Sequence, residues 1–203
     1  MDETRKPRLR WFQYSLRSLL LVMLLASIAM SWVAVRMQKA RKQKEAVEEI
    51  KKSRGWVEYH PGPAWLRNLL GEDCFATVVH VSLHSQITDA GFLKHLKGLT
   101  QLQQLDLNGT PVTDASLEHL KGLTQLQQLD LGGAQVTDAG LEHLKGLTQL
   151  QTLELAWTHV TDAGLEHLKG LTQLRTLDLN YTKVTDEGLK KLQQALPNCK
   201  IIR

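Results

Sequence analysis

The chain repeats itself with a period of 24 residues over its carboxyl-terminal half. Four successive copies of one unit begin at Leu102, Leu126, Leu150 and Leu174, and an imperfect copy begins at Val78. The units follow the pattern L-x-x-L-x-L-x-x-T-x-V-T-D-x-G-L-x-x-L-x-x-L-x-x, with Ala134 in place of the first threonine in one copy and Ser116 in place of the glycine in another, and the last copy leaves the pattern after Leu192. A unit of this length cannot bury its own leucines, so neighbouring units must stack into one continuous core. The period therefore predicts a solenoid.

Each unit predicts one short strand and one helix. L-x-x-L-x-L alternates with a period of two, so Leu129 and Leu131 are expected to point into the core from a strand. The Thr-Asp of V-T-D is expected to begin a helix, with the hydroxyl capping free N–H groups and the carboxylate at the positive end of the helix dipole. Leu141 and Leu144 turn one face of that helix to the core. Buried threonines that bond the turn backbone are expected at Thr110, Thr158 and Thr182.

The repeat pattern resembles a leucine-rich repeat, with threonine at the position where the usual motif has asparagine or cysteine. The V-T-D-x-G-L stretch resembles the cysteine-containing repeats of F-box-associated leucine-rich proteins and, more closely, the short bacterial form on membrane-tethered planctomycete proteins. The resemblance implies an α/β fold, a right-handed solenoid that forms a horseshoe arc of about five coils between two caps. We assign the amino-terminal cap to 55–77, the repeats to 78–199 and a carboxyl-terminal cap strand to 200–203.

The charge is distributed unevenly along the chain. Residues 1–55 hold 13 of the 25 Lys and Arg against 5 of the 21 Asp and Glu, which gives the amino-terminal part a net charge of +8 and the remainder −4. A basic amino-terminal part is typical of contact with a membrane or a polyanion. The remainder is acidic, so nucleic-acid binding by residues 56–203 is not expected. The only two cysteines, Cys74 and Cys199, exclude a disulfide-dense miniprotein and a four-cysteine zinc site. They flank the stack, so both are expected to stay free thiols.

Residues 18–36 predict a single transmembrane helix. The run from Ser18 to Val35 carries no charge, and as a helix it would be about 27 Å long, close to the ~30 Å hydrocarbon core. It follows a basic tail at 1–17 and has basic and aromatic flanks. The alternative is a signal cleaved after Ala29, which would give a secreted repeat protein. The flank after the helix carries more Lys and Arg than the flank before it, which favours a cytoplasmic repeat domain. A short basic amino terminus, however, usually stays in the cytoplasm, which would place the repeats on the other side. The side of the membrane on which the repeats lie is therefore left open.

The segment between the membrane and the repeats has two interpretations. Residues 37–54 predict a basic juxtamembrane helix or linker, which either binds anionic lipid headgroups or is a solvated spacer. A strand at 55–59 and a short helix at 64–70 should follow. Trp56 and Trp65 are expected to plug the open end of the repeat stack, since its first unit would otherwise expose an apolar face to water.

A binding surface is predicted on the outer face of the sheet. The carboxylates between the inward leucines must face outward about 4.8 Å apart, where they repel and raise each other's pKa unless a cation compensates or solvent does. The next positions differ between the units, as in Gly132-Gly133 and Ala156-Trp157, which indicates either recognition or drift at unconstrained positions. The predicted concave-face binding residues are Asp106, Asn108, Asp130, Glu154, Trp157, Asp178, Asn180 and Tyr181.

No catalytic, cofactor-binding or metal-binding residues are predicted. The chain lacks a nucleophile elbow, a phosphate loop and a dinucleotide fingerprint. The repeated histidines should stand about 10 Å apart on a solvated helical face, too far for shared zinc; they are His95, His119, His143 and His167. The predicted function is a membrane-anchored leucine-rich repeat scaffold that binds a protein partner, possibly a basic one. The alternative is a passive structural element of the envelope without a specific ligand.

Overall fold

The computed structural model describes residues 16–61, 76–83 and 90–203. The chain divides into two compact units, Met1–Gln38 and Lys39–Arg203, and the boundary lies within helix α1 (Leu16–Lys52). The expected helix at 64–70, together with Trp65 and Cys74, lies outside the described residues.

The apolar part of α1 is exposed along its length, from Leu19 to Val35. Its most apolar 18-residue window has a mean hydropathy of 2.3, and none of it is buried. Among the described residues it is the one helix long and apolar enough to cross a membrane, although a signal sequence has the same length and composition.

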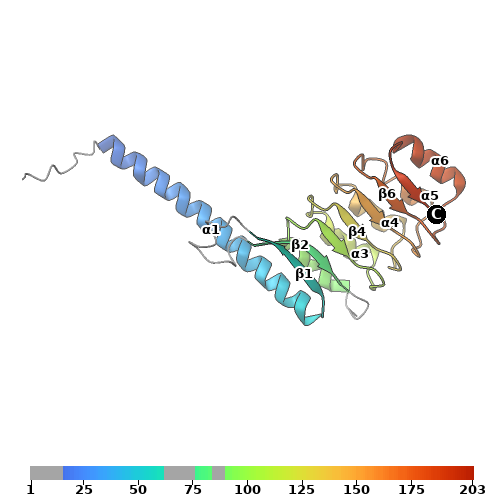
Figure 1. Ribbon diagram of the computed structural model, residues 1–203, viewed down its shortest axis with the longest axis horizontal. Helices are drawn as coiled ribbons and strands as arrows, with labels where there is room; N and C mark the ends of the chain where they lie inside the picture. The colour runs from blue at the N-terminus through green and yellow to red at the C-terminus, as the bar shows by residue number, and fades with distance from the viewer. Residues whose placement is uncertain (1–15, 62–75, 84–89) are drawn as a thin grey trace, which may run out of the picture. The chain divides into compact units, whose positions relative to one another are not determined.

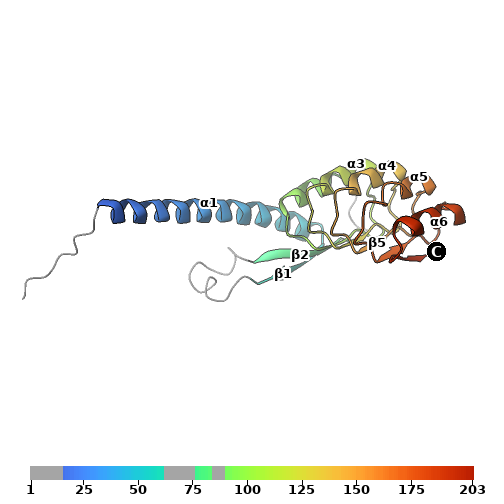
Figure 2. The same ribbon diagram turned by 90° about the horizontal axis from the view of Figure 1, so that it is seen from above.

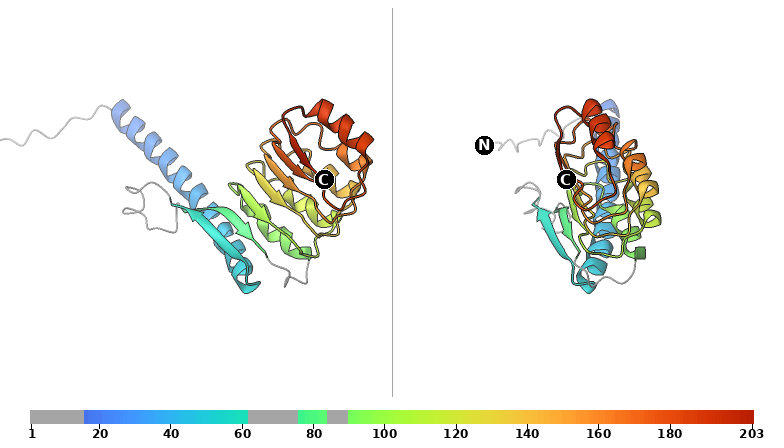
Figure 3. Two further views of the ribbon diagram at one scale, coloured as in Figure 1. Left: turned by 45° about the vertical axis from the view of Figure 1, so that its right-hand side comes forward. Right: turned by 90° about the vertical axis from the view of Figure 1, so that its right-hand side faces the viewer.

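The second unit is built on a seven-stranded sheet in the order of the sequence (Figures 1 and 3). β1 pairs with β2 in the antiparallel direction, and all later pairs are parallel. Equivalent positions of successive units lie opposite each other, as Leu105 does with Leu129 and Leu177 with Ile201. The strands are β1 (Trp56–His60), β2 (Thr77–Ser82), β3 (Gln104–Asp106), β4 (Gln128–Asp130), β5 (Thr152–Glu154), β6 (Thr176–Asp178) and β7 (Lys200–Ile202).

Short helices form the second layer, on the opposite side of the coils from the strands (Figure 2). Leucines from both layers are buried between them, and Leu129, Leu131, Leu141 and Leu144 are at most 1% exposed. The predicted α/β solenoid and its inward leucines are therefore confirmed. The helices are η2 (Ala90–Gly98), α3 (Asp114–Leu117), η3 (Glu118–Leu120), α4 (Asp138–Leu141), η4 (Glu142–Leu144), α5 (Asp162–Leu165) and α6 (Asp186–Ala195).

The threonines of the repeat have the structural roles that the sequence predicts. The hydroxyl of Thr110 donates to the Leu107 carbonyl oxygen over 2.6 Å, and Thr158 and Thr182 make the same bond to Leu155 and Leu179 over 2.7 Å. The V-T-D threonines cap helices, because the hydroxyls of Thr137 and Thr161 accept the N–H two residues later and that of Thr185 accepts the N–H of Gly188, three residues later.

The V-T-D aspartates join successive coils, a role that the sequence analysis does not anticipate. The carboxylate of Asp138 accepts both the N–H and the hydroxyl of Thr161 in the next coil, each over 2.7 Å. Asp114 bonds Thr137 in the same way, and Asp162 bonds Thr185. Hydrogen bonds from the Thr185 side chain and backbone lower the pKa of Asp162. We call these three pairs the Asp–Thr ladder.

The Asp–Thr ladder explains why glycine follows in V-T-D-x-G. A Cβ on Gly164 would come within 2.4 Å of Oδ1 of Asp138, and Gly140 and Gly188 crowd Asp114 and Asp162 in the same way. Real Cβ atoms do not approach an oxygen so closely, so a side chain at these positions would displace the carboxylate. The glycine of the motif therefore makes room for the bond between coils.

The end of α1 closes the amino-terminal end of the core. Ala46, Val47 and Ile50 are at most 6% exposed and belong to the cluster of buried repeat leucines. Gln43 also donates from its side chain to the Ala76 carbonyl oxygen over 2.8 Å. Neither interpretation of 37–54, lipid binding or solvated spacer, anticipates this packing.

The expectation that Trp56 plugs the core is wrong. Its side chain is 53% exposed and meets the His80 ring edge-on at a centroid distance of 5.1 Å. The strand that was expected at 55–59 is present as β1. Among the described residues, the apolar groups that close this end of the core come from α1 and from Val57 of β1 rather than from Trp56.

Replacing Asp138 with Ala should lower the free energy of unfolding by about 2–3 kcal/mol, because the Thr161 N–H and hydroxyl lose a charged acceptor. Asp186→Ala is the matched control. Asp186 occupies the same motif position, but its side chain is 87% exposed and bonds Arg203 rather than a later coil. The control should change stability by less than about 0.5 kcal/mol. Equal losses in urea unfolding of the two variants would contradict the role of the ladder.

Candidate binding surface

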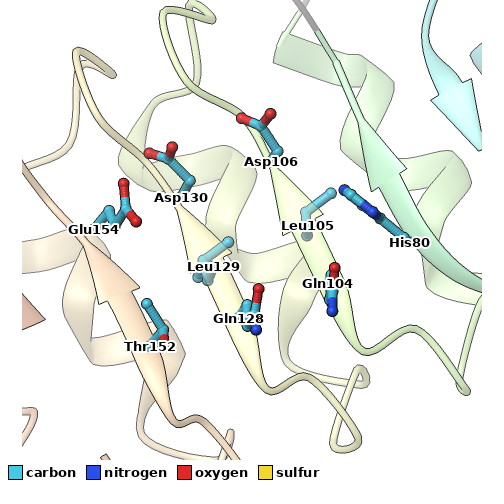
Figure 4. Close-up of a pocket in the computed structure, with 9 residues that line it drawn as sticks. All are labelled: His80, Gln104, Leu105, Asp106, Gln128, Leu129, Asp130, Thr152 and Glu154. Carbon is cyan, nitrogen blue, oxygen red and sulfur yellow. The ribbon is translucent and has the colours of Figure 1, made fainter. Parts of the chain in front are cut away.

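Two rows of polar side chains cross the strands on the outer face of the sheet (Figure 4). The first, which we call the carboxylate row, consists of Asp106, Asp130, Glu154 and Asp178, which lie opposite one another in register. The second row consists of the amides of Gln104 and Gln128 and the hydroxyl of Thr152. A hollow of about 190 Å³ lies over both rows, and its polar lining includes His80, Gln104, Asp106, Gln128, Asp130, Thr152 and Glu154.

Hydrogen bonds hold three members of the carboxylate row in place. Asp106, Asp130 and Asp178 each accept the backbone N–H two residues later, over 2.8–3.0 Å. Asp106 also accepts the Ser82 hydroxyl over 2.8 Å. The predicted binding residues Asn108 and Asn180 direct their amides to Asp130, over 3.3 Å, and to Asp178, over 2.8 Å. These asparagines thus order the row as well as border it.

Desolvation and charge repulsion act together on Glu154. Its side chain lies at the surface, yet partial desolvation on the sheet, followed by repulsion from Asp130, raises the pKa of Glu154. Asp178 and Asp106 act in the same direction. The predicted mutual effect of the carboxylates is therefore present at this residue, where an approaching cation would relieve it.

Trp157 and Tyr181 form a stacked aromatic pair at the edge of this face. Their ring centroids are 3.9 Å apart and the planes are inclined by 17°. They are 64% and 70% exposed. The sequence placed both on the strand surface, whereas the structure places them in the turns that follow β5 and β6. They therefore border the carboxylate row rather than stand within it.

The aromatic pair occupies backbone positions that favour glycine. Trp157 has φ = 61° and Tyr181 has φ = 57°, and the equivalent residues of the two preceding coils are Gly109 and Gly133, at 65° and 70°. Backbone bonds between coils impose this conformation, since Gly133 donates to the Ala156 carbonyl oxygen over 2.8 Å and Trp157 to that of Asn180 over 2.9 Å. The turn geometry is thus the same whichever residue occupies it.

The energy balance gives the aromatic pair no clear role in folding. A left-handed conformation costs a residue with a side chain roughly 1–2 kcal/mol, so the two together cost about 2–4 kcal/mol. Aromatic stacking returns only about 0.5–1.5 kcal/mol beyond the area that it buries, and these rings remain mostly exposed.

On the helical side of the repeats, the described residues form no comparable site. The histidines there are half-buried rather than solvated, and Nδ1 of His119 and of His143 is buried without a hydrogen-bond partner in the described structure. Burial, and then the charges of Lys97 and Lys94, lower the pKa of His119. No group of three potential metal ligands occurs among the described residues. Cys199 is a buried free thiol, and its burial raises its pKa.

Replacing Trp157 and Tyr181 with Gly should lower the free energy of unfolding by no more than about 0.5 kcal/mol, because relief of the strained φ offsets the lost stacking. A buried Leu153→Ala control should cost about 2–5 kcal/mol. The measurement is urea unfolding followed by circular dichroism. A loss of more than about 2 kcal/mol in the glycine double variant would assign the aromatic pair to the fold instead of to binding.

A family model agrees with this architecture. The model of the Leucine Rich repeat family matches residues 122–145, 146–169 and 170–192. No curated protein sequence matches the chain significantly. An internalin (inlF) of Listeria monocytogenes is 29% identical over 54% of this chain and 30% of its own, with a TM-score of 0.48. Internalin C2 of the same species is 34% identical over 53% and 44%, with a TM-score of 0.45.

The chain spans less than half the length of these two internalin structures. The ectodomain of the receptor kinase SOBIR1 from Arabidopsis thaliana is 16% identical over 80% of this chain and 91% of its own, with a TM-score of 0.50, which is a likeness of fold alone. The repeat motif, the parallel sheet and the family match together identify the repeat region of this chain as a leucine-rich repeat domain.

Proposed function

We propose that the protein is a membrane-anchored scaffold that binds a protein partner through the concave face of its sheet and the aromatic pair at its edge. The observation that carries this proposal is the stacked, exposed pair Trp157–Tyr181 in left-handed turns. Large aromatic side chains dominate the binding energy of protein interfaces. Leucine-rich repeat domains typically mediate such interactions.

The partner is basic where it meets the sheet. The carboxylate row presents four acidic groups along one line, and the pKa of Glu154 is raised by burial and by its acidic neighbours. A cationic surface would remove this repulsion on binding and would be steered toward the row at low ionic strength. A passive structural element of the envelope would not require strained, exposed aromatic side chains. We therefore prefer the binding scaffold to this alternative.

Photo-crosslinking tests the binding surface. With p-benzoylphenylalanine in place of Tyr181, irradiation of cells that produce the full chain should yield a discrete protein adduct, because the ring lies at the proposed interface. The same amino acid in place of His143, on the helical side, is the matched control and should yield no such adduct. Absence of an adduct at position 181, or identical adducts from both positions, would favour the passive element.

The anchor is the apolar part of α1. The exposed apolar run continues six residues beyond Ala29, through Trp32 to Val35, and Arg36 lies 5.4 Å from the centre of the Trp32 ring. Interfacial tryptophan and arginine at the end of an apolar helix are typical of a membrane boundary. A cleavage site at Ala29 would lie in the middle of the continuous helix.

Alkaline carbonate extraction tests the anchor. The full chain should remain with the membranes, whereas a Leu25→Arg/Ile28→Arg variant should be released, because each arginine near the centre of the apolar run costs about 2.5–3.5 kcal/mol of insertion free energy. Sequencing of the mature amino terminus completes the test. A chain that begins at Met30, or wild-type protein in the supernatant, would establish the secreted alternative.

A further inference from the structure

We propose that the partner binds by laying an arginine side chain on the free face of Trp157, over the turn formed by Gly132 and Gly133, with its guanidinium beside the carboxylate row. The two glycines are called the glycine shelf below. This inference rests on the proposed function, because it names the group by which the partner is recognised.

The free face of Trp157 follows from the geometry of the stack. Tyr181 belongs to the next coil and covers one face of the indole at a centroid distance of 3.9 Å. The opposite face is directed toward the preceding coil, whose equivalent residue is Gly133. Since glycine has no side chain, this face stays open, in agreement with the 64% exposure of Trp157.

The glycine shelf leaves room for a ligand at this step. Gly133 donates its N–H to the Ala156 carbonyl oxygen over 2.8 Å, which places its backbone beside the turn of Trp157. Gly132 is already covered, since a Cβ there would come within 2.6 Å of Asn108 Nδ2, the amide that bonds Asp130, whereas a Cβ on Gly133 would meet only backbone atoms at 3.7 Å or more. The space for a planar group therefore lies at Gly133, beside the indole of Trp157.

The acidic border of the shelf selects a cation among planar groups. Asp130 is fixed at the shelf by the Gly132 N–H over 2.8 Å, and Glu154 lies next to it in the carboxylate row. A guanidinium stacks on indole and at the same time bonds a carboxylate through two parallel N–H groups, which an ammonium cannot do. Lys183 belongs to the coil of Tyr181, two coils after that of Gly133 in the sequence. This lysine of the chain itself is therefore not the cation at the shelf. A sugar ring would also stack, but it would gain nothing from the negative charge.

Short peptides test the choice of group on the full chain in nanodiscs of neutral phosphatidylcholine. The tryptophans carry a 5-fluoro label, and the Trp157→Gly variant identifies the Trp157 signal in the ¹⁹F spectrum. A capped Gly-Arg-Gly peptide should shift that signal saturably. Peptides with lysine or with the neutral isostere citrulline should bind at least about fivefold and tenfold more weakly, because one lacks the planar fork and the other the charge.

Two matched variants test the place of binding while keeping both Trp157 and the carboxylate row. Gly133→Trp should abolish the arginine response, because a third aromatic ring in the same turn conformation would cover the free face of Trp157. Gly109→Trp introduces the same residue at φ = 65°, one coil further from Trp157, and leaves the free face of Trp157 open, so the arginine response should be kept or strengthened. Circular dichroism shows whether both variants are folded.

The inference is overturned if citrulline binds as well as arginine, if both tryptophan variants respond alike, or if a neutral cello-oligosaccharide shifts the Trp157 signal and the arginine peptide does not. If the arginine peptide does not shift the Trp157 signal but a protein adduct forms at position 181, only this inference is overturned. Failure of both experiments would overturn the proposed function as well.

Discussion

Every coil depends on its neighbours, because its leucines are buried only when another coil covers them. The core leucines of both layers are almost completely inaccessible, and equivalent positions 24 residues apart lie opposite each other along the sheet. Leucine burial alone would tolerate small displacements between coils. The Asp–Thr ladder removes this freedom, since each carboxylate accepts two directed bonds from one threonine of the next coil. Hydrophobic stacking thus provides the stability, and the ladder fixes the register.

A fixed register also determines the backbone of the exposed turns. Residues 109, 133, 157 and 181 share one left-handed conformation, and the N–H groups of the first three bond the turn of the next coil. Glycine adopts that conformation without strain, whereas Trp157 and Tyr181 are strained by it. The solenoid can therefore present a large side chain in a defined orientation without any packing support beneath it. Such preorganisation lowers the entropy lost when a partner binds.

The sequence predicts most of the fold because the repeat reduces it to one local pattern. Alternation of leucines identifies the strands, and Thr110, Thr158 and Thr182 have their expected bonds. The Asp–Thr ladder was missed because it joins residues 23 apart that no local pattern connects. The glycine of V-T-D-x-G was its only signal. The cap formed by α1 was missed because charge dominates that segment, although Val47 and Ile50, one helical turn apart, mark a buried stripe.

The candidate site was predicted in its charges but not in its geometry. Leucine alternation fixes the outward direction of Asp106, Asp130, Glu154 and Asp178, so the carboxylate row follows from the sequence. The conformation of Trp157 does not, because tryptophan itself has no preference for positive φ. The available signal was that Trp157 and Tyr181 align with Gly109 and Gly133. Glycine at this position in two coils indicates a left-handed turn, which the coils of Trp157 and Tyr181 should share. Variation at an aligned glycine position therefore reveals more about a repeat protein than variation at an ordinary surface position, because the substituted side chain must overcome a backbone cost that drift alone would avoid.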